Sequence, residues 1–268
     1  MNKLLIFAKS PIKGKVKTRL KKDTPLTDDD ILKLYIAFLK DTIISASLSK
    51  AQRIYIAYYP EDSKEVMLLA KSEIRNPKSA IELFPQAGKD FDIRLTKALR
   101  NIHNRSSDNI IILGSDSPHI QPSTINKAFK FLSKKSPINP PFTEGGRGGI
   151  RGAMVLGPSG EGGIYLIGLR GDYFNFERVF TAGNESDNLL KIAKRRRLQL
   201  FILEELTDVD VKSDLITLIS NLSMMKYSYS YTKLHLPKYT INAIKELGLK
   251  VNRKGDGTRK KYLSRNKP

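Results

Sequence analysis

The fold is decided by residues 109–118, which read NIIILGSDSP. The β-branched apolar residues are typical of a strand buried on both faces, and the Gly-Ser-Asp-Ser-Pro sequence after them is typical of a tight turn. In an open α/β sheet the ligand crevice borders the carboxyl ends of the strands, so Asp116 could hold a divalent cation against a phosphate there. In the alternative interpretation, Asp116 only caps the next helix.

The composition is typical of a water-soluble globular protein. Of the 268 residues, 40% are hydrophobic and 28% are charged, which favours one α/β domain with appendages. No apolar run approaches the roughly 18 residues that span a bilayer, and the apolar run at residues 4–8 is too short for a signal peptide. We therefore expect a cytoplasmic protein with no membrane span. The absence of cysteine excludes disulfides, thiolate zinc sites and cysteine nucleophiles.

Much of the positive charge lies near the C-terminus. The formal net charge is +20, and residues 226–268 contain twelve Lys or Arg against two acidic residues. Such a segment can attract RNA, anionic lipid or an acidic protein, or it can be a solvated extension. Four of its tyrosines could stack on bases, although no recognisable nucleic-acid-binding motif accompanies them: Tyr227, Tyr229, Tyr231 and Tyr239. We expect residues 223–268 to form a basic C-terminal extension that is accessory to the main domain.

Apolar strands alternate with amphipathic helices, which predicts a mainly parallel sheet with helices on both faces. Strands are expected at residues 3–8, 53–59, 81–84, 109–113, 153–156, 164–169 and 199–203. A long helix is expected after Thr27, which can cap it, and further helices at residues 63–72, 91–102, 123–133, 186–194 and 211–222. Residues 136–152 are rich in proline and glycine and predict a surface insertion, in which Arg147 and Arg151 could close over an anion.

The loop after the first expected strand, residues 9–20, reads KSPIKGKVKTRL and contains five cations. A diphosphate needs such a surface, because Arg binds its oxygens bidentately, Lys supplies charge, and glycine lets backbone N–H groups approach. The spacing matches neither a Walker loop nor the GxGxxG fingerprint. Alone, the loop would be interpreted as a solvated surface. Together with Asp116 in one crevice, it predicts a site for a metal-bound nucleotide.

A set of short motifs occurs in a fixed order within residues 1–222. The motifs are FAKSP at 7–11 with Gly14, VKTRL at 16–20, LY at 34–35, AFL at 37–39 with Asp41, Gln86, Gly88, Asp90 and Arg94, GSDSP at 114–118, GP at 157–158, GG at 162–163, YLIGL at 165–169, and DVD at 208–210 with DL at 214–215. This set resembles a family of small bacterial GT-A-type glycosyltransferases, described as associated with radical-SAM or selenium genes or with arsenosugar biosynthesis.

The resemblance implies a Rossmann-like GT-A fold of the nucleotide-diphospho-sugar transferase type, with residues 1–222 as the catalytic domain. It implies a metal-dependent enzyme that moves a sugar from a nucleoside-diphosphate sugar to a hydroxyl group of a small-molecule acceptor. Asp116 would correspond to the metal-binding acid of the Asp-x-Asp element, which reads Ser-Asp-Ser here. Asp208 or Asp210, with Asp210 preferred, would supply the second ligand of Mg²⁺ or Mn²⁺. Alternatively, both cap the helix that contains Asp214.

The nucleotide is expected to bind the basic loop and the helix at residues 91–102, through Lys9, Gly14, Lys17, Thr18, Arg19 and Arg94. An ion pair with Asp90 would explain Arg94 without a ligand. Glu161 replaces the aspartate of the family's Asp-Gly-Gly-Tyr motif, and it could act as a general base on the acceptor hydroxyl or only form a turn. His119 adjoins the Asp116 turn, but a single histidine is weak support for a metal site.

Two other classes of function remain open. A nucleotidyltransferase, similar to the phospholactate guanylyltransferases or molybdenum-cofactor enzymes that share this fold, would use the same loop and metal for attack at the α-phosphate of a nucleoside triphosphate and would release pyrophosphate. A non-catalytic protein would bind RNA or an acidic partner through the basic C-terminal extension, and this binding would be sensitive to salt.

Overall fold

A mainly parallel sheet of seven strands, in the order β3-β2-β1-β4-β6-β5-β7, forms the centre of the part of the chain that the structure describes. This computed structural model describes residues 1–64, 67–68, 80–134, 152–172, 174–253 and 260–265. The strands are β1 (Asn2–Lys9), β2 (Arg53–Tyr59), β3 (Ala80–Pro85), β4 (Asn109–Leu113), β5 (Gly152–Pro158), β6 (Ile164–Gly171) and β7 (Gln199–Ile202). Every strand that the sequence predicts is present, and the expected α/β fold is confirmed.

The strand directions place two loops at one edge of the sheet. β1 pairs in parallel with both β2 and β4, and β6 runs antiparallel to its neighbours β4 and β5. Since β1 and β4 are parallel neighbours, the loop after β1 and the turn after β4 leave the sheet side by side. All five residues of β4 are buried, as expected for a β-branched run between two strands.

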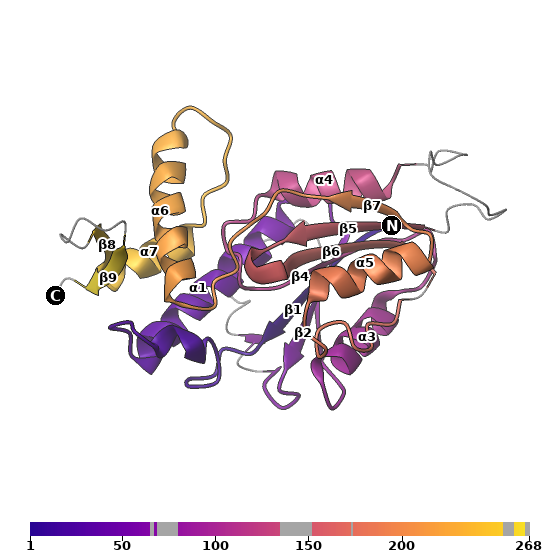
Figure 1. The fold of residues 1–268 in the computed structure, drawn as a ribbon, viewed down its shortest axis with the longest axis horizontal. Helices are drawn as coiled ribbons and strands as arrows, with labels where there is room; N and C mark the ends of the chain where they lie inside the picture. Colours follow the sequence, from indigo (N-terminus) through magenta and orange to yellow (C-terminus); the bar gives the residue numbers. More distant parts are fainter. Residues whose placement is uncertain (65–66, 69–79, 135–151, 173, 254–259, 266–268) are drawn as a thin grey trace.

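Four helices cover the two faces of the sheet (Figure 1). α1 (Asp28–Ser47) and α4 (Pro122–Leu132) pack on one face, and α3 (Phe91–Ile102) and α5 (Glu185–Arg195) pack on the other. Thr27 caps α1 as predicted, with its hydroxyl accepting the N–H of Asp30. The expected helix at residues 63–72 and the insertion at residues 136–152, with Arg147 and Arg151, lie largely outside the described residues. In the described ranges, no helix has both the length and the apolar character that crossing a membrane requires.

A small C-terminal module stands against α1, beside the sheet (Figure 1). It consists of α6 (Lys212–Ser228), α7 (Lys238–Glu246), β8 (Leu249–Arg253) and β9 (Lys261–Arg265). Its apolar side chains share a buried cluster with α1 and with Leu20 of the 3-10 helix η1 (Thr18–Lys21). The boundary predicted between residues 222 and 223 falls inside α6. The basic C-terminal segment is thus folded around a core that it shares with α1, and α7 is the element in direct contact with α1.

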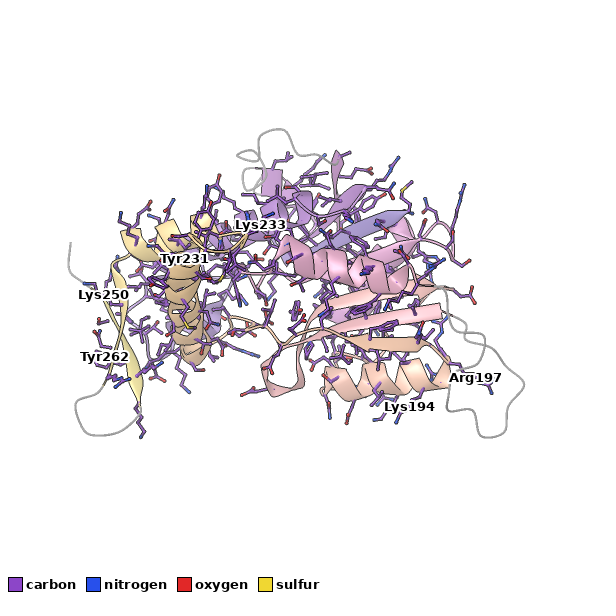
Figure 2. The ribbon with its side chains drawn as sticks, turned by 90° about the horizontal axis from the view of Figure 1, so that it is seen from above. Lys194, Arg197, Tyr231, Lys233, Lys250 and Tyr262 are labelled. Atoms are coloured by element: carbon purple, nitrogen blue, oxygen red, sulfur yellow. The ribbon has the colours of Figure 1, made fainter. Side chains whose placement is uncertain are left out.

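Cationic side chains lie at both ends of the molecule. Figure 2 shows Lys250 on the β8–β9 hairpin and Tyr231 and Lys233 between α6 and α7, with Lys194 and Arg197 at the far end, beside α5. Tyr231 is 75% exposed. The positive charge is therefore a property of a wide surface and not of the C-terminal module alone.

Asp41 attaches α7 to α1. It is 1% exposed, and its carboxylate accepts the N–H groups of Tyr239 (3.2 Å) and Thr240 (2.7 Å) at the start of α7. N–H groups in the first turn of a helix have no partner within that helix. Burial raises the pKa of Asp41 to about 6, although the donated hydrogen bonds act in the opposite direction.

We expect the Asp41→Asn variant to lose a pH dependence of stability that the wild type has. The pKa of Asp41 is about 6 in the folded protein and 3.8 as a reference, so the folded state binds more protons between these values. The free energy of unfolding of the wild type should fall relative to that of the variant by about 1–3 kcal/mol as the pH rises from about 4 to about 7. Urea denaturation measures this, with Asp29→Asn on the exposed side of α1 as a control; a difference that does not vary with pH contradicts it.

Candidate active site

A cavity of about 460 Å³ opens at the carboxyl ends of β1 and β4. Its volume is in the range of small-molecule sites. The loop after β1, α1, the ends of β2 and β3, α3 and the turn after β4 contribute to its wall. The predicted site residues that line it are Lys9, Lys17, Thr18, Arg19, Arg94, Asp116 and Asp210. The structure thus brings the basic loop and the Asp116 turn into one cavity.

Lys17 joins the two carboxylates of this cavity. Its side chain is 5% exposed, and its Nζ lies 2.8 Å from Asp116 Oδ2 and 2.7 Å from Asp210 Oδ1. Arg19 lies farther out, with Nη1 3.8 Å from Asp210 Oδ2 and a side chain that is 77% exposed. A buried ammonium is therefore held between two partly exposed carboxylates, with a guanidinium that faces solvent beside them.

The local sequence explains why Lys17 points inward. Val16 and Leu20 are buried, so they fix both ends of the short segment around Lys17 to the protein interior. Lys17 itself has φ 46° and ψ 36°, and η1 begins directly after it. Gly14 has φ 72°, a left-handed conformation that glycine adopts without steric cost. Gly14 lies outside the cavity wall and shapes the loop.

Val209 holds the segment 208–210 against the turn that contains Asp116. Val209 is fully buried, and its N–H donates to the carbonyl of Asp116 (2.9 Å). This contact sets Asp210 beside the Asp116 carboxylate. Asp208 lies on the other side of the turn, where Ser117 Oγ donates to Asp208 Oδ1 (3.4 Å).

The structure contradicts the capping interpretations of these acids. Asp214 caps α6, because its Oδ2 accepts the N–H groups of Asp210 (3.0 Å) and Val211 (2.8 Å). The side chain of Asp210 is instead paired with a lysine. The residue that precedes α4 is Gln121, so Asp116 does not occupy the N-cap of that helix.

Burial and mutual charge set the ionisation of the cluster. Burial alone would lower the pKa of Lys17, but the carboxylates of Asp116 and Asp210 outweigh it and hold this pKa above its ordinary value. Burial likewise opposes the ionisation of Asp210, but Lys17 holds the pKa of Asp210 below its usual range. Burial and the charge of Asp116 raise the pKa of Asp208 to about 7. At neutral pH, Lys17 is therefore protonated and Asp210 is ionised.

The donor set fits a Mg²⁺ or Mn²⁺ ion that is completed by phosphate. Asp116 and Asp210 present two carboxylate oxygens to a single point, which Lys17 Nζ occupies in the structure. In nucleotide sites, Mg²⁺ is commonly held by one or two carboxylates together with substrate phosphates. The described residues contain no group of three or more His, Cys, Asp or Glu that could hold an ion by themselves. A cation bound here would therefore depend on phosphate oxygens.

Gln86 joins the strands β1 and β2 to α3 at the cavity wall. Its Nε2 donates to the carbonyls of Ala8 (3.0 Å) and Ala57 (2.9 Å), and its Oε1 accepts a hydrogen bond from Arg94 Nε (3.2 Å). The guanidinium of Arg94 lies over the ring of Tyr59, 4.3 Å from the centroid. A planar cation is therefore fixed against an aromatic ring at the cavity wall.

The structure also bears on the predictions made for Asp90, Glu161 and His119. Asp90 Oδ1 accepts the N–H of Ile93 (2.9 Å) and caps α3, so the contacts of Arg94 are with Gln86 and Tyr59 in place of an ion pair with Asp90. Glu161 is exposed on the 3-10 helix η2 (Gly160–Gly162), outside the cavity wall. His119 is buried outside this wall, and burial lowers its pKa to about 4, so it is neutral at physiological pH.

Two tyrosines were not assigned to the site from sequence. Tyr35 of α1 donates to the carbonyl of Lys9 (2.7 Å), and its hydroxyl contacts Ser115 Oγ (3.2 Å), so it joins the loop after β1 to the turn after β4. Tyr59 lies at the carboxyl end of β2, a position that strand prediction could have marked. Tyr35 belongs to the LY motif at residues 34–35, but the helical pattern alone marks it only as a buried residue.

An apolar recess of about 70 Å³ adjoins the cavity and shares Phe7 and Phe91 with it. Gly114, Ile164 and Phe180 also line the recess. No atom lies within 4 Å of the position that a Cβ of Gly114 would take, so the glycine leaves open space directly before the Asp116 turn.

We expect the Gln86→Leu variant to lower the free energy of unfolding by about 1–3 kcal/mol, because the carbonyls of Ala8 and Ala57 would lose buried donors. The Arg94→Met variant removes only the partner on the cavity side and should change the same free energy by less than about 1 kcal/mol. Urea denaturation of both variants tests this difference. A loss for Gln86→Leu that is no larger than the loss for Arg94→Met would contradict the prediction.

Comparison with solved structures finds one relative with the same fold and others that are more distant. A presumed nucleotide-diphospho-sugar transferase from Desulfovibrio desulfuricans G20 is 24% identical and has a TM-score of 0.68, with 91% of this chain and 97% of that chain covered. A cytidylyltransferase from Leptospira borgpetersenii serovar Hardjo-bovis is 15% identical, with a TM-score of 0.49 and coverage of 91% and 94%. Rv0371c from Mycobacterium tuberculosis H37Rv in complex with manganese is 13% identical, with a TM-score of 0.41 and coverage of 81% and 97%. The last two similarities are too distant to bear on the site.

A search of curated proteins finds no match. Residues 42–183, more than half of the chain, match the family model described as "Uncharacterized protein conserved in bacteria (DUF2064)". The protein therefore belongs to the DUF2064 family and has a GT-A-like fold of the nucleotide-diphospho-sugar transferase type.

Proposed function

We propose that this protein is a metal-dependent glycosyltransferase that moves a sugar from a nucleoside-diphosphate sugar to a hydroxyl group of a small-molecule acceptor. The observation that carries the proposal is the meeting of Lys17, Asp116 and Asp210 in a cavity at the carboxyl ends of β1 and β4. The name of the Desulfovibrio protein, which shares the fold, agrees with this activity. The narrower resemblance, to transferases associated with radical-SAM or selenium genes or with arsenosugar biosynthesis, stays a prediction.

The cationic side of the cavity would bind the diphosphate. Lys9, Lys17 and Arg19 surround it, and Thr18 offers a hydroxyl donor. These charges would neutralise the nucleoside diphosphate as it leaves, when its negative charge increases. A Mg²⁺ or Mn²⁺ ion held by Asp116 and Asp210 would supply Lewis-acid stabilisation of the same leaving group.

The nucleoside would extend toward Arg94. The guanidinium of Arg94, which Gln86 and Tyr59 fix, offers planar hydrogen-bond donors at the cavity wall. Gly14 would contribute by shaping the loop that carries the phosphate ligands.

The acceptor would bind on the side of the apolar recess. Phe7 and Phe91 line both this recess and the nucleotide cavity, and residues of β6 border the recess. η2 leads into β6, where the carbonyl of Tyr165 accepts the N–H of Gly114 (3.3 Å). Glu161, which is exposed on η2 just before β6, is our candidate for the residue that accepts the proton of the acceptor hydroxyl.

We expect the Asp116→Asn variant to lose metal-dependent transfer by at least about 100-fold, because charge stabilisation of the leaving group is lost. Its thermal unfolding should change little, since Asp210 still pairs with Lys17. The assay incubates nucleotide-sugars and nucleoside triphosphates with and without Mn²⁺ and measures release of nucleoside diphosphate and of pyrophosphate. Asp29→Asn, which alters an exposed carboxylate, serves as the control.

Unaltered transfer by the Asp116→Asn variant would refute the role of Asp116. Release of pyrophosphate from a nucleoside triphosphate, without turnover of any nucleotide-sugar, would identify a nucleotidyltransferase instead. Salt-sensitive RNA binding without nucleotide binding would identify the non-catalytic alternative.

A further inference from the structure

We infer that Lys17 and the divalent cation exclude one another from the Asp116–Asp210 pair, so that a bound diphosphate must draw Lys17 away before the metal can bind both carboxylates. This inference rests on the metal site of the proposed function. It adds that metal and diphosphate bind cooperatively and that Lys17 is the reason.

The distances require the exclusion. Lys17 Nζ lies 2.8 Å from Asp116 Oδ2 and 2.7 Å from Asp210 Oδ1, which are the lengths of charge-assisted hydrogen bonds. A Mg²⁺ ion that bridged the same two oxygens would lie about 2.0–2.1 Å from each. Its position would therefore overlap the ammonium group, so the two cations cannot share these oxygens.

The charges of the two carboxylates favour replacement of the Lys17 ammonium by a divalent cation. One ammonium faces two carboxylates in the present arrangement, whereas a divalent cation would balance both. A third carboxylate, that of Asp208, lies at the same turn, where it accepts a hydrogen bond from Ser117 Oγ (3.4 Å). Removing Lys17 without replacement would leave the carboxylates uncompensated in a partly buried site, which is costly.

The displaced ammonium needs a new anion. Apart from Asp116, Asp210 and Lys17 itself, the charged residues that line the described cavity are cationic: Lys9, Lys15, Arg19 and Arg94. A diphosphate bound among these cations would supply the anion that Lys17 requires. Metal and diphosphate then each increase the affinity of the site for the other, by the same factor.

The loop permits the movement. Val16 and Leu20 anchor the backbone on both sides of Lys17, so the main chain can stay in place. The lysine side chain is a flexible four-carbon stem, and rotation about its own bonds can carry Nζ from the carboxylates toward a phosphate in the same cavity.

The test measures Mn²⁺ affinity directly, by water proton relaxation or by the electron paramagnetic resonance signal of free Mn²⁺. Inorganic pyrophosphate serves as the diphosphate, with correction for the Mn²⁺–pyrophosphate complex in solution. Wild-type protein should bind Mn²⁺ at least tenfold more tightly when pyrophosphate is present. The Lys17→Met variant should bind Mn²⁺ alone at least tenfold more tightly than the wild type does, and pyrophosphate, which still offers oxygen ligands to the metal, should raise this affinity by a smaller factor than in the wild type.

The Lys13→Met variant is the matched control. It removes the same charge from the same loop, but Lys13 pairs with the exposed Asp29 (2.7 Å). Its Mn²⁺ affinity and its response to pyrophosphate should equal those of the wild type. Circular dichroism checks that each variant is folded, and the wild-type comparison with and without pyrophosphate needs no variant at all.

Two results would overturn the inference. A folded Lys17→Met variant that binds Mn²⁺ no more tightly than the wild type would show that Lys17 does not compete, and equal wild-type affinities with and without pyrophosphate would show that the two ligands are not coupled. Either result leaves the proposed transferase intact if Asp116→Asn still abolishes transfer. Failure of every protein to bind Mn²⁺, even with pyrophosphate, overturns both the inference and the metal site.

Discussion

The ion cluster of Lys17 with Asp116 and Asp210 is the constraint on which the active-site end of this molecule depends. It joins residues that are as far as 193 positions apart in the sequence. A buried ammonium costs several kcal/mol unless oppositely charged groups surround it. The loop after β1, the turn after β4 and the segment before α6 must therefore meet at one point. The hydrogen bond from Val209 to the carbonyl of Asp116 fixes the same meeting through the backbone.

The constraint extends into the C-terminal module. Leu20 lies in η1, which begins directly after Lys17, and Val209 directly precedes Asp210. The side chains of Leu20 and Val209 belong to the cluster that α1, α6 and α7 bury together. The residues on either side of the ion cluster thus have their anchors in the core of the module. Packing defects in this core would shift the charged groups as well. The C-terminal module is consequently part of the support of the site and not only a carrier of positive charge.

Local patterns were enough to predict most elements of the sheet and its helices. The strand 109–113 is β-branched and ends at glycine, and the helix 91–102 starts at the capping residue Asp90, so both have the bounds expected. The antiparallel direction of β6 could not be predicted, because an apolar run has the same pattern in either direction. The cavity residues at strand ends were predictable from topology, whereas the contact between Lys17 and Asp210 depends on how distant segments pack.

The Ser-Asp-Ser sequence changes what the site requires of the fold. An Asp-x-Asp element would carry both carboxylates on one turn, at positions that local structure alone would set. Here the partner of Asp116 is Asp210, which is positioned by Val209 in the core and by the capping of α6 at Asp214. In the proposed enzyme, both metal-binding carboxylates are therefore in place only when α6 is packed in the core that it shares with α1 and α7. The stability of that packing, to which Asp41 contributes by holding α7 on α1, would then set how much of the protein has a complete metal site.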